Sequence, residues 1–239
     1  MLKRLILTTA MSLAALSSAW AEDKLPVTGK TCSELLAFYQ NLPFTSILPL
    51  PDGPVSIPGK TGDITVGFSQ TGFNHPWRTA MLAALQAEAC RHPNIKLVVV
   101  DGNVDVAKQN NDVRDLLARG VDAVLMSPVE SAALAPAARA VMSAGLPLIV
   151  MDRDVPTDKT LFIGQSNVTM GEGVAEKMAK DLGGKGNIVV ITGLKGSSAA
   201  VDRDKGMKNV LANTPISRSW RLATDSGFAT RPYRSWKTF

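Results

Sequence analysis

Histidine and cysteine are scarce in this sequence of 239 residues, which contains two of each. Neither His75 nor His92 belongs to a cluster with the spacing of metal ligands, so we expect no metal site. The sequence also lacks a Gly-x-Ser-x-Gly motif, the turn that carries the nucleophile of α/β hydrolases. A hydrolase or a metal-dependent enzyme is therefore disfavoured, and we expect no cofactor.

Long apolar runs are also missing. The apolar run LILTTAMSLAAL near the N-terminus is too short to span a bilayer, and no later run approaches that length. It follows Lys3 and Arg4 and precedes a small-x-small site, AWA, at residues 19–21. This order is typical of a secretory signal peptide over residues 1–21. We expect cleavage after Ala21 and export of the mature chain.

The net charge of +5 is not carried by the body of the chain. Lys3 and Arg4 supply two positive charges, and residues 214–239 supply a net four. Residues 22–213 therefore carry a net charge of −1. A basic face for nucleic acid is not indicated, and export makes such a partner less plausible still.

The two cysteines are Cys32 and Cys90. An even count in an exported protein permits one disulfide, and two separate buried thiols are the alternative. We favour the disulfide, which would tether an N-terminal extension, residues 22–62, to the end of the first core helix. In that extension, TCSELLAFYQNL predicts a short helix capped by Thr31 or Ser33, and the four prolines that follow exclude regular structure.

From residue 63 onward, apolar runs alternate with segments of helical period. Six short runs are rich in Val and Ile and are bounded by Gly, Pro, Asp or Asn, as buried strands are: ITVGFS, KLVVVDG, DAVLMSP, LPLIVMDRD, TLFIGQSN and NIVVITG. In the segment after KLVVVDG, the residues Val106, Val113 and Leu116 share one helical face. Apolar strands that alternate with helices predict an α/β fold, with a parallel sheet covered by helices on both faces.

Polar side chains follow these runs where each predicted strand ends. Right-handed crossovers bring the carboxyl ends of parallel strands to one edge, so we expect the polar residues to meet there. The set is Ser69, Asp101, Ser127, Asp152, Arg153, Gln165 and Asn167. Helix capping is the simpler explanation for Asp101 and Ser127. It does not explain Trp77 and Arg78, which follow the first strand.

These residue types suit the recognition of a sugar. A sugar ring presents hydroxyl groups that donate and accept hydrogen bonds, together with an apolar C–H face. Carboxylates accept, arginine donates from a rigid fork, and an indole packs flat against the C–H face. Asp152 and Arg153 could bind neighbouring hydroxyls while partly neutralising each other, and the ligand would complete their hydrogen bonds.

The motifs VGFSQ followed by PWR, VVVDG, GVDAVLMSPVES, PLIVMDR and ITGLKGSSAAVDRDKG occur in this order. Through these motifs, residues 63–213 resemble the periplasmic sugar-binding proteins of bacterial ABC importers, which are type I periplasmic binding proteins. The ribose-binding and galactofuranose-binding branch is the most similar. The resemblance implies a monosaccharide clamped between two lobes, a membrane permease as partner, a monomer, and a place in the periplasm. Residues 63–165 would form the first lobe and residues 166–213 part of the second.

The resemblance also assigns roles to single residues. Trp77 stands where the family places an aromatic side chain that stacks on the sugar. The other positions that match binding positions, or flank Trp77, are Ser69, Arg78, Ser127, Asp152, Arg153 and, in the second lobe, Arg203. Gln165 is a further candidate at the edge of the sheet, and His75 is either a ligand contact or a surface turn residue. Arg78 beside the indole favours the galactofuranose-like branch.

The sequence departs from the family pattern after residue 213. Residues 214–239 lack the periodicity of a helix or strand, and we expect an aberrant or disordered tail, for which we favour a frameshift or a premature end. A chain truncated in this way would bind sugar weakly or not at all. A periplasmic sensor that feeds a membrane receptor is an alternative function. A sugar-responsive repressor would need an N-terminal helix-turn-helix, which residues 22–62 do not contain, and an exported α/β enzyme is the least favoured.

Overall fold

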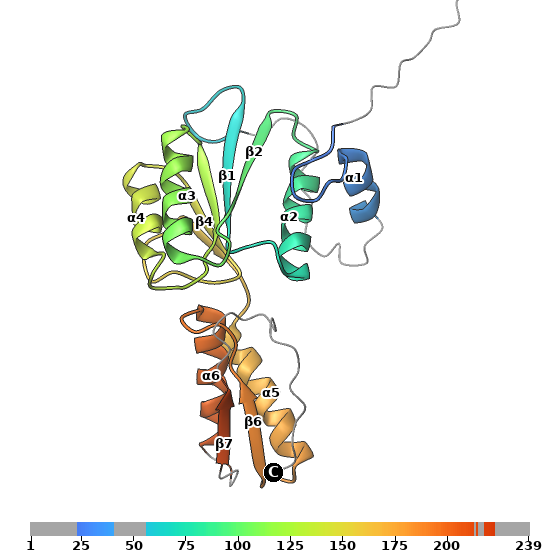
Figure 1. Ribbon diagram of the computed structural model, residues 1–239, viewed down its shortest axis with the longest axis vertical. Coiled ribbons are helices and arrows are strands. Elements are labelled where there is room, and N and C mark those ends of the chain that lie inside the picture. The colour runs from blue at the N-terminus through green and yellow to red at the C-terminus, as the bar shows by residue number, and fades with distance from the viewer. Residues whose placement is uncertain (1–22, 41–55, 213, 215–217, 223–239) are drawn as a thin grey trace, which may run out of the picture.

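The computed structural model describes residues 23–40, 56–212, 214 and 218–222 (Figure 1). In chain order, the elements are α1 (Cys32–Gln40), β1 (Ile64–Gln70), α2 (Pro76–Ala89), β2 (Ile95–Asp101), α3 (Val106–Ala118), β3 (Ala123–Ser127), α4 (Ala135–Ser143), β4 (Leu148–Met151), β5 (Leu161–Ile163), α5 (Asn167–Asp181), β6 (Asn187–Ile191), α6 (Ser198–Leu211) and β7 (Arg218–Leu222). The expected signal peptide, residues 1–21, lies outside the described residues, as does most of the expected tail.

The first unit is a five-stranded parallel sheet with the strand order β2-β1-β3-β4-β5. All six apolar runs of the sequence form strands, five in this sheet and one as β6. In register, Gln70 at the end of β1 lies opposite Asp101 on β2 and Ser127 on β3. The carboxyl ends of neighbouring strands therefore meet at one edge, as the fold prediction requires.

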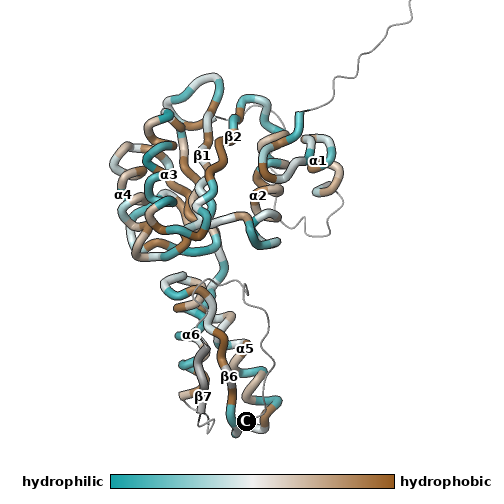
Figure 2. Tube along the Cα trace, viewed as in Figure 1, coloured by the Kyte–Doolittle hydropathy of each residue, from teal (hydrophilic) through white to brown (hydrophobic). Residues whose placement is uncertain are grey.

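Helices cover both faces of this sheet. On one face, α3 and α4 pack against a core cluster that includes Val124, Met126 and Leu148. On the other face, Leu82 of α2 packs against Phe68. Successive residues of a strand point to opposite faces, and the apolar side chains of the strands belong to the core clusters on both. The hydrophobic colour of the trace is concentrated along strands such as β1 and β2 (Figure 2). This two-sided burial explains why the strands are continuous apolar runs in the sequence.

The N-terminal segment is bound to the outer side of α2. Cys32 and Cys90 form a disulfide, with 5.7 Å between their Cα atoms. Thr28 Oγ1 donates a hydrogen bond to Gln86 Oε1 at 2.6 Å, and Leu35 is 1% exposed. Thr31 caps α1, because its hydroxyl oxygen accepts a hydrogen bond from the Glu34 backbone N–H. None of the described helices is long and apolar enough to cross a membrane.

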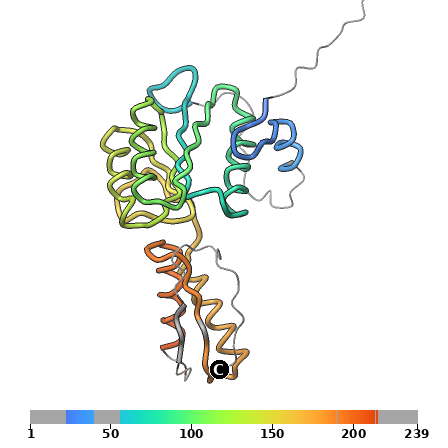
Figure 3. Tube along the Cα trace, in the orientation of Figure 1, coloured from blue at the N-terminus to red at the C-terminus, as the bar shows by residue number. Residues whose placement is uncertain are grey.

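The second unit contains α5, α6 and a separate two-stranded parallel sheet, β6 and β7. The chain enters it in the short segment between β5 and α5 (Figure 3). Gly171 of α5 lies against the backbone of Arg203, and Gly206 of α6 lies against the backbone of Val168. The two helices approach so closely because these positions have no Cβ atom.

The structure corrects one expectation here. The sequence after residue 213 shows no apolar periodicity, yet Arg218–Leu222 forms β7, which pairs with β6 from Asn187 to Ile191. A strand that pairs with a neighbour is held by backbone hydrogen bonds, and these do not depend on an alternating side-chain pattern. The absence of periodicity was therefore not sufficient to exclude a strand.

The loop between β6 and α6 touches the first unit. Leu194 is buried in the same core cluster as Val129 and Val155. The Ser131 N–H donates to the Gly196 carbonyl at 2.9 Å, and the Asp154 N–H donates to Ser198 Oγ at 2.8 Å. The second unit is thus joined to the first by packing and hydrogen bonds as well as by the connecting chain.

Candidate ligand-binding site

Arg78 enters the site from the first turn of α2. His75 is the N-cap of that helix, and its Nδ1 accepts a hydrogen bond from the Trp77 N–H at 3.1 Å. Pro76 follows in the first turn, where its missing N–H costs nothing. This start places Arg78 facing inward and 5% exposed, whereas Trp77 is 55% exposed. In this structure His75 therefore acts as a capping residue.

The Arg78 guanidinium joins three strands of the sheet. Its Nη2 lies 3.0 Å from Asp152 Oδ2, and its Nη1 donates to Ser127 Oγ at 2.6 Å and to Gln70 Oε1 at 3.4 Å. Burial lowers the pKa of Arg78, and the nearby carboxylate of Asp152 opposes that shift. The ion pair compensates the buried charge of Arg78 and the partly buried charge of Asp152 at the edge of the sheet.

This arrangement revises the predicted role of Asp152. The sequence suggested that Asp152 and Arg153 partly neutralise each other; the charge of Asp152 does act on Arg153, but the ion pair of Asp152 is with Arg78. Asp152 has φ of +64°, a left-handed conformation that is uncommon outside glycine. Because the backbone turns there, the two adjacent side chains have different partners. Strain of this kind is often found at binding sites.

The Arg153 guanidinium is bound by the loop that follows β3. Its Nη1 donates to the Val129 carbonyl at 2.9 Å and, at 3.4 Å, to the Pro128 carbonyl. Burial, the positive charge of Arg78 and that of Arg203 lower the pKa of Arg153 to about 10, while Asp152 acts in the opposite direction. The carbonyl contacts leave other N–H groups of this five-donor side chain for a ligand.

Ser69 and Ser127 lie beneath the edge of the sheet, and both are fully buried. Ser127 Oγ accepts from Arg78 and does not cap a helix, because α4 begins at Ala135 and its N-cap is Leu134. Asp101 accepts from the Asn103 N–H at 2.8 Å in a local turn, and the cap of α3 is Asp105. The prediction that Ser127 caps a helix was therefore wrong. Asp101 is not a cap either, since the residue that caps α3 is Asp105, about one helical turn later.

The sequence reasoning missed Gln109 of α3, which is 0% exposed. Its Nε2 donates to the Ser127 carbonyl at 3.0 Å and to Ser69 Oγ at 3.2 Å. Its Oε1 accepts from the Val129 N–H at 2.8 Å. In the sequence, Gln109 lies among other polar residues of the helix. The one feature that could have indicated its role is its position on the helix face that packs against the sheet.

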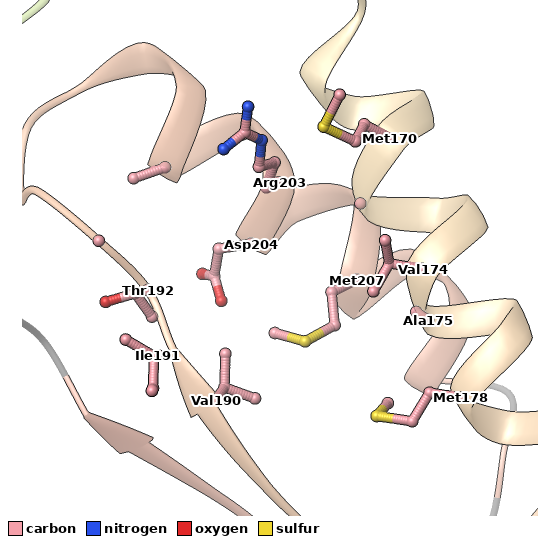
Figure 4. A pocket seen from close by; sticks show the side chains of 13 residues that line it. Met170, Val174, Ala175, Met178, Val190, Ile191, Thr192, Arg203, Asp204 and Met207 are labelled. Atoms are coloured by element: carbon pink, nitrogen blue, oxygen red, sulfur yellow. The ribbon is translucent and has the colours of Figure 1, made fainter. Parts of the chain in front are cut away.

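Gln165 and Arg203 lie farther along the chain. Gln165 is exposed in the connection between the units. Arg203 lies on α6 and lines a cavity of about 740 Å³ between α5, α6 and β6 (Figure 4). The lining is mostly apolar and includes Met170, Val174 and Met207. Because Arg203 alone among the predicted residues lines it, this cavity is a poor candidate for sugar binding.

The carboxyl edge of the sheet thus holds a compensated carboxylate and a guanidinium bound by carbonyl groups, and the exposed indole of Trp77 lies on the same first turn of α2 as Arg78. Within the described ranges, no three His, Cys, Asp or Glu residues are placed to hold a metal ion. The described groups can donate and accept hydrogen bonds and can pack against an apolar surface. This is recognition chemistry for a polar ring compound.

Residues 66–227 match the family model described as a periplasmic binding protein domain. The chain belongs to the periplasmic binding protein family. The ribose import binding protein RbsB of Bacillus subtilis is 31% identical over 153 residues, which are 64% of this chain and 50% of that protein. The galactofuranose-binding protein YtfQ of Escherichia coli is 32% identical over 173 residues, 70% of this chain and 54% of that protein.

Solved structures of periplasmic binding proteins have the same fold. A galactofuranose-binding protein aligns with a TM-score of 0.61 at 30% identity, covering 68% of this chain and 56% of its own. The fructose-binding periplasmic domain of a hybrid two-component system aligns with a TM-score of 0.63 at 30% identity, covering 66% and 54%. The chain spans about half the length of the curated relatives that it matches. The relatives are binding proteins, which supports a non-enzymatic role at the level of the family.

Proposed function

We propose that this chain is a substrate-binding component of a sugar ABC transporter, which captures a monosaccharide in the periplasm for a membrane permease. The observation that carries the proposal is the Arg78–Asp152 ion pair with Arg153 beside it at the carboxyl edge of the first sheet, and Trp77 is exposed on the same first turn of α2 as Arg78. Relatives named for ribose and galactofuranose support the class of ligand. Export through a signal peptide over residues 1–21 and a monomeric state are parts of the same proposal.

The affinity expected for the described residues is low. In this family two lobes close on the ligand, and domain closure needs contacts from both sides. Here Arg203 is the one proposed contact that the second unit contributes. We therefore expect dissociation constants on the order of 1 mM, which corresponds to about 4 kcal/mol of binding free energy.

Saturation-transfer difference NMR suits such weak binding. The panel contains D-ribose, methyl β-D-galactofuranoside, D-fructose, L-arabinose, xylitol and myo-inositol. We expect saturable transfer to the C–H protons of at least one furanose. Trp77→Ala should abolish it, and Phe38→Ala is the matched control, because Phe38 is an equally exposed aromatic on α1. Absence of transfer from the whole panel, or transfer that survives Trp77→Ala, would contradict the proposal.

A second candidate is a periplasmic sensor that passes the ligand signal to a membrane receptor. The alignment with the periplasmic domain of a hybrid two-component system favours it. Both candidates need the same ligand site and differ in the membrane protein that they contact. The membrane genes adjacent to the coding sequence distinguish them, since a permease and an ATPase indicate transport and a receptor indicates sensing.

A further inference from the structure

Gln109 connects three segments beneath the proposed site. It packs against the carboxyl end of the sheet so tightly that a Cβ at Gly102 would lie 3.2 Å from its Cβ and Cγ atoms. Its amide uses both ends: Nε2 donates to Ser127 and Ser69, and Oε1 accepts from Val129. A fully buried amide with its donor and acceptor both satisfied has one preferred orientation, because any other leaves polar groups unpaired.

The backbone of Val129 transmits this orientation to the site through the two peptide groups that flank its Cα atom. Its N–H is held by Gln109 Oε1 at 2.8 Å, and its carbonyl accepts from Arg153 Nη1 at 2.9 Å. A hydrogen-bonded path therefore runs from α3 through one residue of the loop after β3 to a guanidinium on the loop after β4. Arg153 is flanked by Asp152, whose carboxylate Arg78 holds. The two arginines are thus oriented by different elements.

We propose that Gln109 is a positioning residue for the ligand, which acts through Val129 to orient the guanidinium of Arg153. The role in binding rests on the proposed function, because it requires that Arg153 contact the sugar. The orientation of Arg153 does not depend on the proposed function, and it can be measured in the absence of any ligand. The two parts can therefore fail separately.

The neighbouring residue Asn110 provides a matched control. It lies on the same helix and also holds the loop after β3, because its Nδ2 donates to the Ala133 carbonyl at 3.1 Å. That contact lies four residues beyond Val129 and has no direct link to Arg153. A purely structural role of α3 would make the effects of Gln109 and Asn110 alike, whereas a positioning role confines the effect on Arg153 to Gln109.

The test is the ¹⁵N–¹H spectrum of the arginine side chains, with the Arg153 signals assigned through Arg153→Lys. We expect Gln109→Met, which keeps the length but neither hydrogen-bonding end, to shift the Arg153 Nε signal and to accelerate exchange of its guanidinium protons. Asn110→Ala should leave both unchanged. If Gln109→Met does not fold, Gln109→Asn, which is one methylene too short to reach both segments, replaces it.

Wild-type Arg153 signals in a folded Gln109→Met or Gln109→Asn variant would overturn the inference, even if thermal stability fell. Equal shifts in Asn110→Ala would also overturn it. For the binding part, the same variants are titrated with methyl β-D-galactofuranoside, and Gln109→Met should weaken binding about tenfold, which corresponds to about 1.4 kcal/mol. A wild-type protein that binds no sugar would refute the proposed function while the spectrum still decides the positioning of Arg153.

Discussion

Arg78 Nη2 and Asp152 Oδ2 lie 3.0 Å apart and join the first turn of α2 to the residue after β4. The two side chains are 6% and 17% exposed. Since β1, β3 and β4 are neighbours in that order, this ion pair spans the middle of the carboxyl edge of the sheet. The ion pair places the carboxylate of Asp152 at the site, and the more buried guanidinium of Arg78 compensates the charge of that carboxylate.

Asp152→Asn should reduce the free energy of unfolding by about 3 kcal/mol, because it leaves the guanidinium of Arg78 buried without its counter-charge. The double variant Arg78→Met/Asp152→Asn should recover part of this loss. Urea unfolding of the single variants and the double variant gives the coupling energy. Strictly additive losses would show that the two residues do not act as a pair.

Removal of the disulfide by Cys32→Ala/Cys90→Ala should lower the free energy of unfolding by up to about 4 kcal/mol, because the bond closes a loop with a sequence separation of 58 in the unfolded chain. The segment before α2 should then become the first site of limited proteolysis. The wild-type protein under reducing conditions is the control and should behave in the same way. Unfolding curves that are identical with and without reductant would contradict the tether.

Gly171→Ala should destabilise the contact between α5 and α6, because its new Cβ would collide with the backbone of Arg203. Gly173→Ala, two residues along the same helix, is the matched control, since no atom lies within 4 Å of a Cβ there. That control should stabilise the protein by about 0.5–1 kcal/mol through helix propensity. Thermal unfolding measures both variants, and equal shifts would argue against close packing of the helices.

Asp122 should contribute to acid sensitivity. A hydrogen bond from Lys60, followed by one from the Thr65 N–H, lowers the pKa of Asp122 below its ordinary value of 3.8. A carboxyl with a lowered pKa in the folded state stabilises the protein above the pKa of the unfolded chain. That stabilisation is lost as the pH falls through the lower, folded-state value.

Asp122→Asn should accordingly cost about 1 kcal/mol at neutral pH and much less once the pH has fallen below the folded-state pKa of Asp122. Urea unfolding at several pH values measures the difference between the variant and the wild type. Asp63→Asn serves as the control, because the ion pair of Asp63 with Lys96 is largely exposed. A difference for Asp122→Asn that does not change with pH would contradict the pKa shift.

The elements of the first unit could be predicted because their signals are local. Apolar runs such as AVLMS, which forms β3, are buried on both faces of a parallel sheet, so nearly every residue of the strand is under the same constraint. The gathering of Ser127, Asp152 and Arg153 at one edge follows from the handedness of the crossovers, which is also general. The strand β7 could not be predicted, since backbone pairing with β6 carries no side-chain signature.

The sequence by itself determined the alternation of strands and helices and the edge at which polar groups collect. Only the tertiary structure decided which guanidinium meets Asp152, because that depends on the rotation of α2 and on the positive φ at Asp152. It also decided that Gln109 lies under the site, since contacts between distant segments depend on how α3 is set against the sheet. Hydrogen bonds act over about 3 Å, so partners are selected by packing, which no periodicity encodes.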